Sequence, residues 1–270
     1  MISFRCCCFF IIRCYSRQTK QIVYIYDENL DPITLSWYHG HIIQFVWFDQ
    51  IKSFVVLTDH QHYEIYTIEL TNSFRLKIRL RTYLTTKIDE IHKEKILLQT
   101  DANHLFIYYE KLNERKYLRL LNLSFECVRL YSLDKYVSSQ EKILALGIDD
   151  RHVSSTKKKG FIEDFFRLQI VLFIRSVDGL CLLIINKLKM CFIDRWILSK
   201  ESRESQLIVY FQTISSYFLL EQSILRFYQF DKQIGELDLN STTSFSSIVL
   251  QNDGSFIFSN NTNDLLVFHQ

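Results

Sequence analysis

The sequence predicts an all-β protein built from repeated four-stranded antiparallel units. Aromatic residues make up 15% of the chain, with 22 Phe and 15 Tyr, and residues of this kind favour strands. Short apolar segments separated by polar turns also recur along the chain, at steps of 42, 74, 47 and 39 residues. Because hydrophobic residues reach 48% and charged residues only 23%, the chain is predicted to be folded throughout.

The clearest repeat is a pair of segments, FVVLTDHQHYEIYTIEL (54–70) and ILLQTDANHLFIYYEKL (96–112). Each runs from an apolar strand through Thr-Asp and a polar turn into an alternating strand. We expect both segments to be the second and third strands of a unit, with Asp59 and Asp101 capping free backbone amides in the turn. Three further segments each show an apolar strand, a short polar turn and a second apolar strand: residues 170–188, 217–233 and 255–270.

A first strand is predicted ahead of each hairpin, where apolar residues stand three positions apart. These pairs are Ile42 and Phe45, Ile88 and Ile91, Ile162 and Phe165, Ile208 and Phe211, and Phe245 and Ile248. A fourth strand is predicted after the hairpin, where every second residue is apolar. The fourth strands are residues 74–80, 116–123, 189–198 and 233–239. Each unit therefore has four strands.

The ends and the middle of the chain fit this pattern less well. The N-terminal unit is predicted to be partial, with middle strands CFFIIR (8–13) and IVYIYD (22–27) followed by PITLSW (32–37). Between residues 124 and 160 the strand candidates are ECVRLYSL (126–133) and EKILALGID (141–149), which indicates a degenerate unit.

Four antiparallel strands repeated about every 40 residues predict a β-propeller, because sheets packed face to face bury both of their faces. The expected fold class is all-β, a β-propeller of about six to seven four-stranded units in a single domain (1–270), with the terminal units partial and one degenerate. A β-sandwich and a fragment of a larger propeller are the alternatives.

One local motif resembles a known repeat. In HGHIIQFVWF (39–48), Gly40-His41 stands just before a strand, similar to the Gly-His that opens WD repeats. At the level of architecture the chain resembles the WD-repeat, YVTN and NHL-like propeller superfamily. The Trp-Asp that closes the third strand of a WD repeat is replaced here by IYTIE, FIYYE and RFYQF.

The C-terminal segment bears on closure of the ring. Turns are predicted at residues 252–254 and 260–264, which leaves LLVFHQ (265–270) as a third strand without a sequential partner on its far side. We expect an N-terminal segment to pair with this strand and close the ring.

Charge and hydropathy limit the classes of partner. Lys and Arg (32) nearly balance Asp and Glu (30), so no nucleic-acid partner is predicted. No membrane span is predicted either, because Arg175 and Asp178-Gly179 divide the apolar run at 168–188 into two strands. Residues 1–20 are basic and apolar, which is typical of a targeting segment or of first strands.

Cysteine usage indicates the compartment. The chain has seven Cys, an odd number, and four of them lie close together at positions 6, 7, 8 and 14. This does not form a spaced disulfide framework, so free thiols in a reducing compartment are predicted. The expected location is the cytoplasm, with an organelle reached through residues 1–20 as the alternative. Modification of Cys6, Cys7 and Cys8 by palmitate is a further alternative.

The sequence carries no recognised catalytic motif and predicts no catalytic residue and no cofactor. Two sets of residues are candidate sites. His39, His41, His60 and His62 are metal-ligand candidates, since they occupy two neighbouring turns and imidazole binds zinc or copper. Candidate contacts for a protein partner are the aromatic loop Trp37, Tyr38 and His39 and the basic run Lys157, Lys158 and Lys159, which otherwise forms a solvated loop.

These features predict a non-enzymatic propeller that binds an unknown protein partner through its loop face. The alternatives are a truncated or degenerate propeller copy with no dedicated activity, and a propeller hydrolase or metal-binding enzyme.

Overall fold

A computed structural model describes residues 12–17, 20–26, 32–59, 62–70, 76–87, 90–92, 95–149, 169–187, 189–199, 205–211, 216–221, 224–229, 232–239, 245–250, 256–260 and 265–268. The chain divides into two compact units. The first contains Met1–Leu133, Val249–Ile257 and Val267–Gln270, and the second contains Asp134–Ile248 and Phe258–Leu266.

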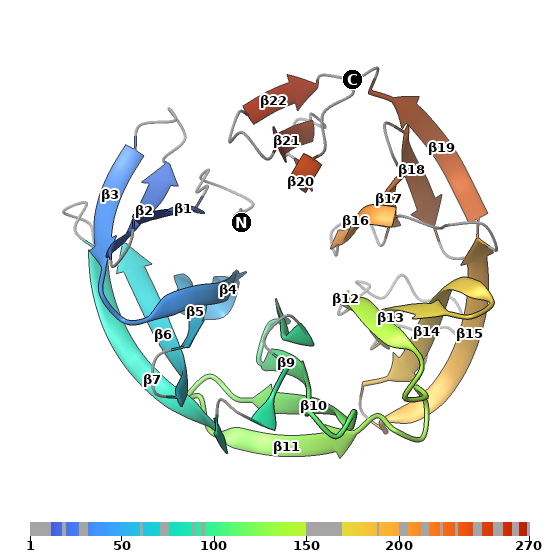
Figure 1. Cartoon of the computed structure of the whole chain (residues 1–270), viewed down its shortest axis with the longest axis horizontal. Helices are drawn as coiled ribbons and strands as arrows, with labels where there is room; N and C mark the ends of the chain where they lie inside the picture. Colours follow the sequence, from blue (N-terminus) through green and yellow to red (C-terminus); the bar gives the residue numbers. More distant parts are fainter. Residues whose placement is uncertain are drawn as a thin grey trace, which may run out of the picture. The chain divides into compact units, whose positions relative to one another are not determined.

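The strands of the described residues form six antiparallel sheets (Figure 1). The first three sheets comprise β1 (Ile12–Arg17), β2 (Lys20–Tyr26) and β3 (Pro32–Trp37); β4 (His41–Phe48), β5 (Ser53–Asp59), β6 (His62–Leu70) and β7 (Leu76–Lys87); and β8 (Leu97–Thr100), β9 (Leu105–Glu110), β10 (Lys116–Leu121) and β11 (Cys127–Ser132). A 3-10 turn, η1 (Asp49–Ile51), connects β4 and β5.

The other three sheets continue the same arrangement. They comprise β12 (Lys142–Asp149), β13 (Gln169–Ser176), β14 (Gly179–Asn186) and β15 (Cys191–Ser199); β16 (Ser205–Phe211), β17 (Ser216–Glu221), β18 (Ile224–Gln229) and β19 (Lys232–Asp238); and β20 (Phe245–Leu250), β21 (Phe256–Asn260) and β22 (Leu265–Phe268). In every sheet the strands lie side by side in sequence order, which is the topology of a propeller blade. The two terminal sheets have three strands each, as predicted for partial units.

Burial follows the position of a strand within its sheet. Four strands in second or third position, β5, β9, β13 and β14, are buried over most of their length, and a strand that is buried on both faces reads as a near-continuous apolar run. The fourth strands β11 and β19 are largely exposed. Successive sheets share cores within each unit, as where Phe48 and Leu57 pack with Leu105 and Ile107.

The structure corrects one assignment in the third sheet. Residues 96–112 form a hairpin as predicted, but its strands β8 and β9 are the first and second of their sheet, whereas β5 and β6 are the second and third of theirs. Ile91 makes an isolated bridge to Lys111 and does not begin a sheet. Segments 54–70 and 96–112 are thus alike in local pattern, but their strands hold different positions within their sheets.

The same difference in strand position explains why the repeat pattern is weak between residues 124 and 160. Residues 127–132 form β11, the fourth strand of the third sheet, and residues 142–149 form β12, the first strand of the next. Both segments therefore belong to four-stranded sheets, and the degenerate unit predicted there is not needed to account for them. Ile162 and Phe165, predicted to begin that sheet, lie outside the described residues.

The apolar run at 168–188 forms two strands, as predicted. β13 ends at Ser176 and pairs there with Gly179, so Val177 and Asp178 make the turn. Gly179 has a φ of 120°, a conformation that favours glycine. No helix among the described residues is long and apolar enough to cross a membrane.

At the N-terminus, the first described strand is β1, which begins later than the predicted CFFIIR strand, and β1 pairs with β2. β22 lies in the last sheet with β20 and β21. Residues 1–11, the predicted turn at 252–254 and most of the turn at 260–264 lie outside the described residues, so the pairing that would close the ring stays a prediction.

Candidate functional site

The turn that leads into β4 is held by a side chain from the end of β3. Trp37 is buried, and its Nε1 donates a hydrogen bond to the carbonyl oxygen of Gly40 at 3.0 Å. Gly40 has a φ of 80°, which a residue with a Cβ adopts only at a cost. The tryptophan and the glycine together fix the path of the intervening residues.

His39 is packed between two rings. Its ring centroid lies 5.1 Å from that of Trp37 and 4.8 Å from that of Tyr66. The Tyr66 hydroxyl donates to Glu64 Oε2 at 2.8 Å, and burial together with this hydrogen bond raises the pKa of Tyr66 above its ordinary value. His39 is therefore part of an aromatic cluster that fixes the turn. Tyr38, between Trp37 and His39, is 61% exposed.

The other predicted metal ligands have different surroundings. His41 begins β4, is exposed and stands opposite Asp59 in the strand register. His62 begins β6 and lies edge-on to the ring of Tyr83 at 6.0 Å. His60 lies outside the described residues. In the part of the chain that the structure describes, no group of three or more His, Cys, Asp or Glu side chains is placed to hold a metal ion.

The basic run Lys157, Lys158 and Lys159 also lies outside the described residues, so its role as a contact for acidic partners stays a prediction. The turn-capping role predicted for Asp101 is confirmed. Its Oδ1 accepts hydrogen bonds from the backbone amides of Asn103 at 2.6 Å and His104 at 2.7 Å. Asp59 ends β5, and the next two residues, 60 and 61, lie outside the described residues, so its capping role stays a prediction.

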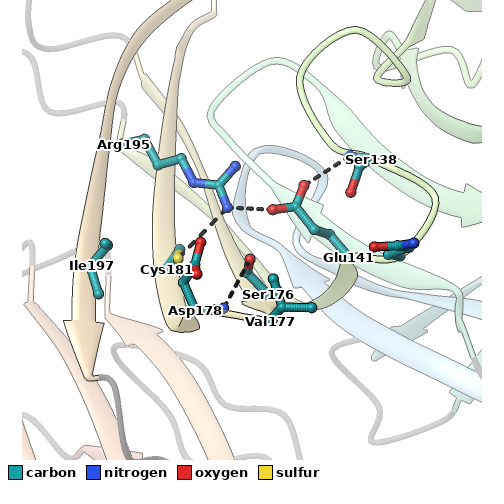
Figure 2. Close-up of a pocket in the computed structure, with 9 residues that line it drawn as sticks. Ser138, Glu141, Ser176, Val177, Asp178, Cys181, Arg195 and Ile197 are labelled. Carbon is teal, nitrogen blue, oxygen red and sulfur yellow. Dashed lines mark hydrogen bonds and ion pairs between the residues drawn. The ribbon is translucent and has the colours of Figure 1, made fainter.

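A pocket of about 310 Å³ opens at one end of the β12–β15 sheet, within the second unit (Figure 2). At this end of the sheet, β12 and β14 begin and β13 ends. The Trp37–Gly40 turn has the equivalent position in its own sheet, because it leads into the first strand, β4. The lining of the pocket comes from the segment before β12, the β13–β14 hairpin and β15: Ser138, Gln140, Glu141, Ser176, Val177, Asp178, Cys181, Arg195 and Ile197.

Two lining residues of the pocket, Glu141 and Arg195, form an ion pair. Arg195 Nη2 donates to Glu141 Oε1 and also to the thiol sulfur of Cys181 at 3.7 Å, and the backbone N–H of Ser138 donates to Glu141 Oε2 at 2.8 Å (Figure 2). Burial acts to raise the pKa of Glu141, but the hydrogen bonds and charge of Arg195 and the hydrogen bond of Ser138 outweigh it and hold that pKa below its ordinary value. The hydrogen bond to Glu141 raises the pKa of Arg195.

This pocket was not foreseen from the sequence. The turn at Asp178-Gly179 and the alternation of residues 189–198 are local signals that place Asp178 at a sheet end and Arg195 on an outer strand. The partner of Arg195 is Glu141, 54 positions earlier, and no local pattern joins the two. The described residues that line the pocket include no histidine and no group of metal ligands.

No protein-family model matches the chain, and no curated protein matches it in sequence. Solved structures do match it. The WD40 β-propeller domain of Doa1 superposes with a TM-score of 0.52 at 10% identity, covering 96% of this chain and 77% of that one. The Dos1 propeller superposes with a TM-score of 0.51 at 10% identity, covering 96% of this chain and 68% of that one. The chain therefore has a β-propeller architecture, as its sequence predicts.

Proposed function

We propose that this β-propeller is a non-enzymatic scaffold that binds a protein partner through the turns at one end of its sheets, with Tyr38 as a contact residue. The observation that carries the proposal is the turn at 37–40, where an exposed tyrosine stands between two residues that are fixed by packing.

The physical argument concerns the entropy of binding. A tyrosine offers a large apolar ring and a polar hydroxyl, which is why this residue is enriched at the centres of interfaces. Binding costs less when the contact residue is already ordered. The Trp37–Gly40 hydrogen bond and the packing of His39 against Tyr66 fix the residues on both sides of Tyr38 before a partner arrives.

A photo-crosslinking amino acid placed at position 38 of the full chain in cells tests the proposal. The matched control is position 83, because Tyr83 is also an exposed tyrosine and lies on β7 of the sheet that follows the turn. We expect position 38, and not position 83, to give a discrete crosslinked species that mass spectrometry identifies as one protein.

The crosslinked protein then supplies the quantitative test. Tyr38→Ala should weaken its binding by about tenfold or more, as expected for loss of an interface anchor, whereas Tyr83→Ala should leave the affinity within about twofold. Equal crosslinking at both positions, or an affinity unaffected by Tyr38→Ala, would show that this turn is not the contact.

A further inference from the structure

The lining of the pocket at the end of the β12–β15 sheet includes one charged group outside its ion pair, the carboxylate of Asp178. Arg195 is engaged by Glu141, so these two formal charges cancel. The third ionisable group of the lining with a full charge at pH 7 is Asp178, in the turn between β13 and β14, where it is exposed. The lining therefore carries one net negative charge, on the exposed Asp178.

The remaining polar groups of the lining accept hydrogen bonds as readily as they donate them. They are the hydroxyls of Ser138 and Ser176 and the side-chain amide of Gln140. A cationic group that enters would find the Asp178 carboxylate together with hydroxyl and amide oxygens. An anionic group would meet the carboxylates of Asp178 and Glu141, and the one cation present is already hydrogen-bonded to Glu141.

Apolar side chains flank these acceptors. Val177 is 86% exposed and Ile197 is 54% exposed, although both line the pocket. Lysine and arginine side chains pack their methylene stems along such apolar surface while their charged ends stay in a polar environment. The described residues offer no group of ligands for a metal ion, so a simple metal cation does not match the site.

We infer that this pocket binds a basic side chain, a lysine or an arginine, presented by a protein partner, with its stem against Val177 and Ile197 and its charged end at Asp178. The inference rests on the proposed function only in that the basic side chain belongs to a protein.

Binding can be measured without knowing the partner, by using blocked single amino acids as probes. Amide resonances of residues 176–181 in the isotopically labelled full chain would be followed during titration with N-acetyl-lysine N-methylamide and N-acetyl-arginine N-methylamide. Two further probes separate the causes: N-acetyl-norleucine N-methylamide has the stem without the charge, and N-acetyl-glutamate N-methylamide has the opposite charge.

We expect the lysine and arginine probes to shift these resonances in a saturable manner and the other two probes to shift them weakly or not at all. Asp178→Asn should weaken binding of the basic probes by about tenfold, the effect of losing a charge-assisted hydrogen bond. Glu236→Gln removes the same charge from an exposed position on β19 of the same unit and should leave probe binding within about twofold, since it lies outside the lining.

Three results would overturn the inference: no shift with either basic probe, equal shifts with the norleucine probe, or a shift with the glutamate probe alone, which would indicate that Arg195 receives an anion. None of these outcomes involves Tyr38. Failure of the pocket is thus separable from failure of the proposed interaction at the turn.

Discussion

The indole nitrogen of Trp37 donates a hydrogen bond to the carbonyl of Gly40 at 3.0 Å, and this contact joins the end of β3 to the start of β4. The tryptophan is buried among residues of the first two sheets, including Val23, Ile42 and Phe45. The residue predicted as a surface contact is therefore also a core residue, and the exposed member of the loop is its neighbour Tyr38.

Trp37→Phe should lower the free energy of unfolding by about 1 to 2 kcal/mol, because it removes a partly buried hydrogen bond and some packed area. The control is Trp47→Phe, since Trp47 donates its Nε1–H to Asp49 in an exposed hydrogen bond. Urea unfolding of both variants provides the comparison. A Trp47→Phe effect as large as that of Trp37→Phe would mean that the hydrogen bond to Gly40 adds nothing.

Gly40→Ala should destabilise the protein by about 1 to 2 kcal/mol, because a φ of 80° brings a Cβ against the backbone. Gly235→Ala, in β19, is the matched control. A Cβ there would meet Phe227 Cδ2 at 3.7 Å, an ordinary contact, so the substitution should be neutral or stabilising by up to about 1 kcal/mol. Thermal and urea unfolding should rank the two variants in that order, and the reverse ranking would contradict the assigned turn geometry.

Asp101→Ala should cost about 1 to 2 kcal/mol, because the backbone amides of Asn103 and His104 both lose their acceptor in the turn between β8 and β9. Asp101→Asn keeps a carbonyl oxygen at the same place and should cost less. Hydrogen exchange at these two amides gives a local readout. We expect faster exchange in Asp101→Ala, and an unchanged rate would show that Asp101 does not cap the turn.

Glu141→Gln should destabilise the protein at pH 7 by about 1 to 3 kcal/mol, since it leaves Arg195 without its charged partner. The folded state lowers the pKa of Glu141, so the stabilisation is present above its ordinary pKa of 4.5 and is lost as the pH falls through the lower folded value. The difference between wild type and variant, measured by urea unfolding from pH 7 down to pH 3, should therefore shrink on acidification.

The control for this pH dependence is Glu236→Gln, which changes an exposed carboxylate of the same unit. Its effect should stay within about 0.5 kcal/mol across the same range, as for most surface substitutions. A wild-type advantage over Glu141→Gln that persists unchanged at pH 3 would mean that the ion pair is not its source.

Much of the strand content followed from local pattern. Residues 32–37 form β3 as predicted, and β5, β6, β13, β14, β17 and β18 coincide with predicted hairpins, because alternation and turn residues act within a few positions of one another. The grouping of hairpins into sheets is less local. The pair Ile88 and Ile91 has the spacing of a first strand, but the first strand of that sheet is β8. We attribute this choice to the packing of β8 against β4 of the preceding sheet.

The amino-acid sequence by itself determined the fold class, the antiparallel hairpins and the capping role of Asp101, since each depends on residues close together in the chain. Tertiary structure decided that Trp37 is buried while Tyr38 is exposed, because the two are adjacent in sequence and only Trp37 packs into the core shared by the first two sheets. It also decided that Arg195 meets Glu141 and that a pocket lies beside them. Contacts between residues 54 positions apart depend on how whole strands align, and strand alignment is fixed by the burial of both sheet faces.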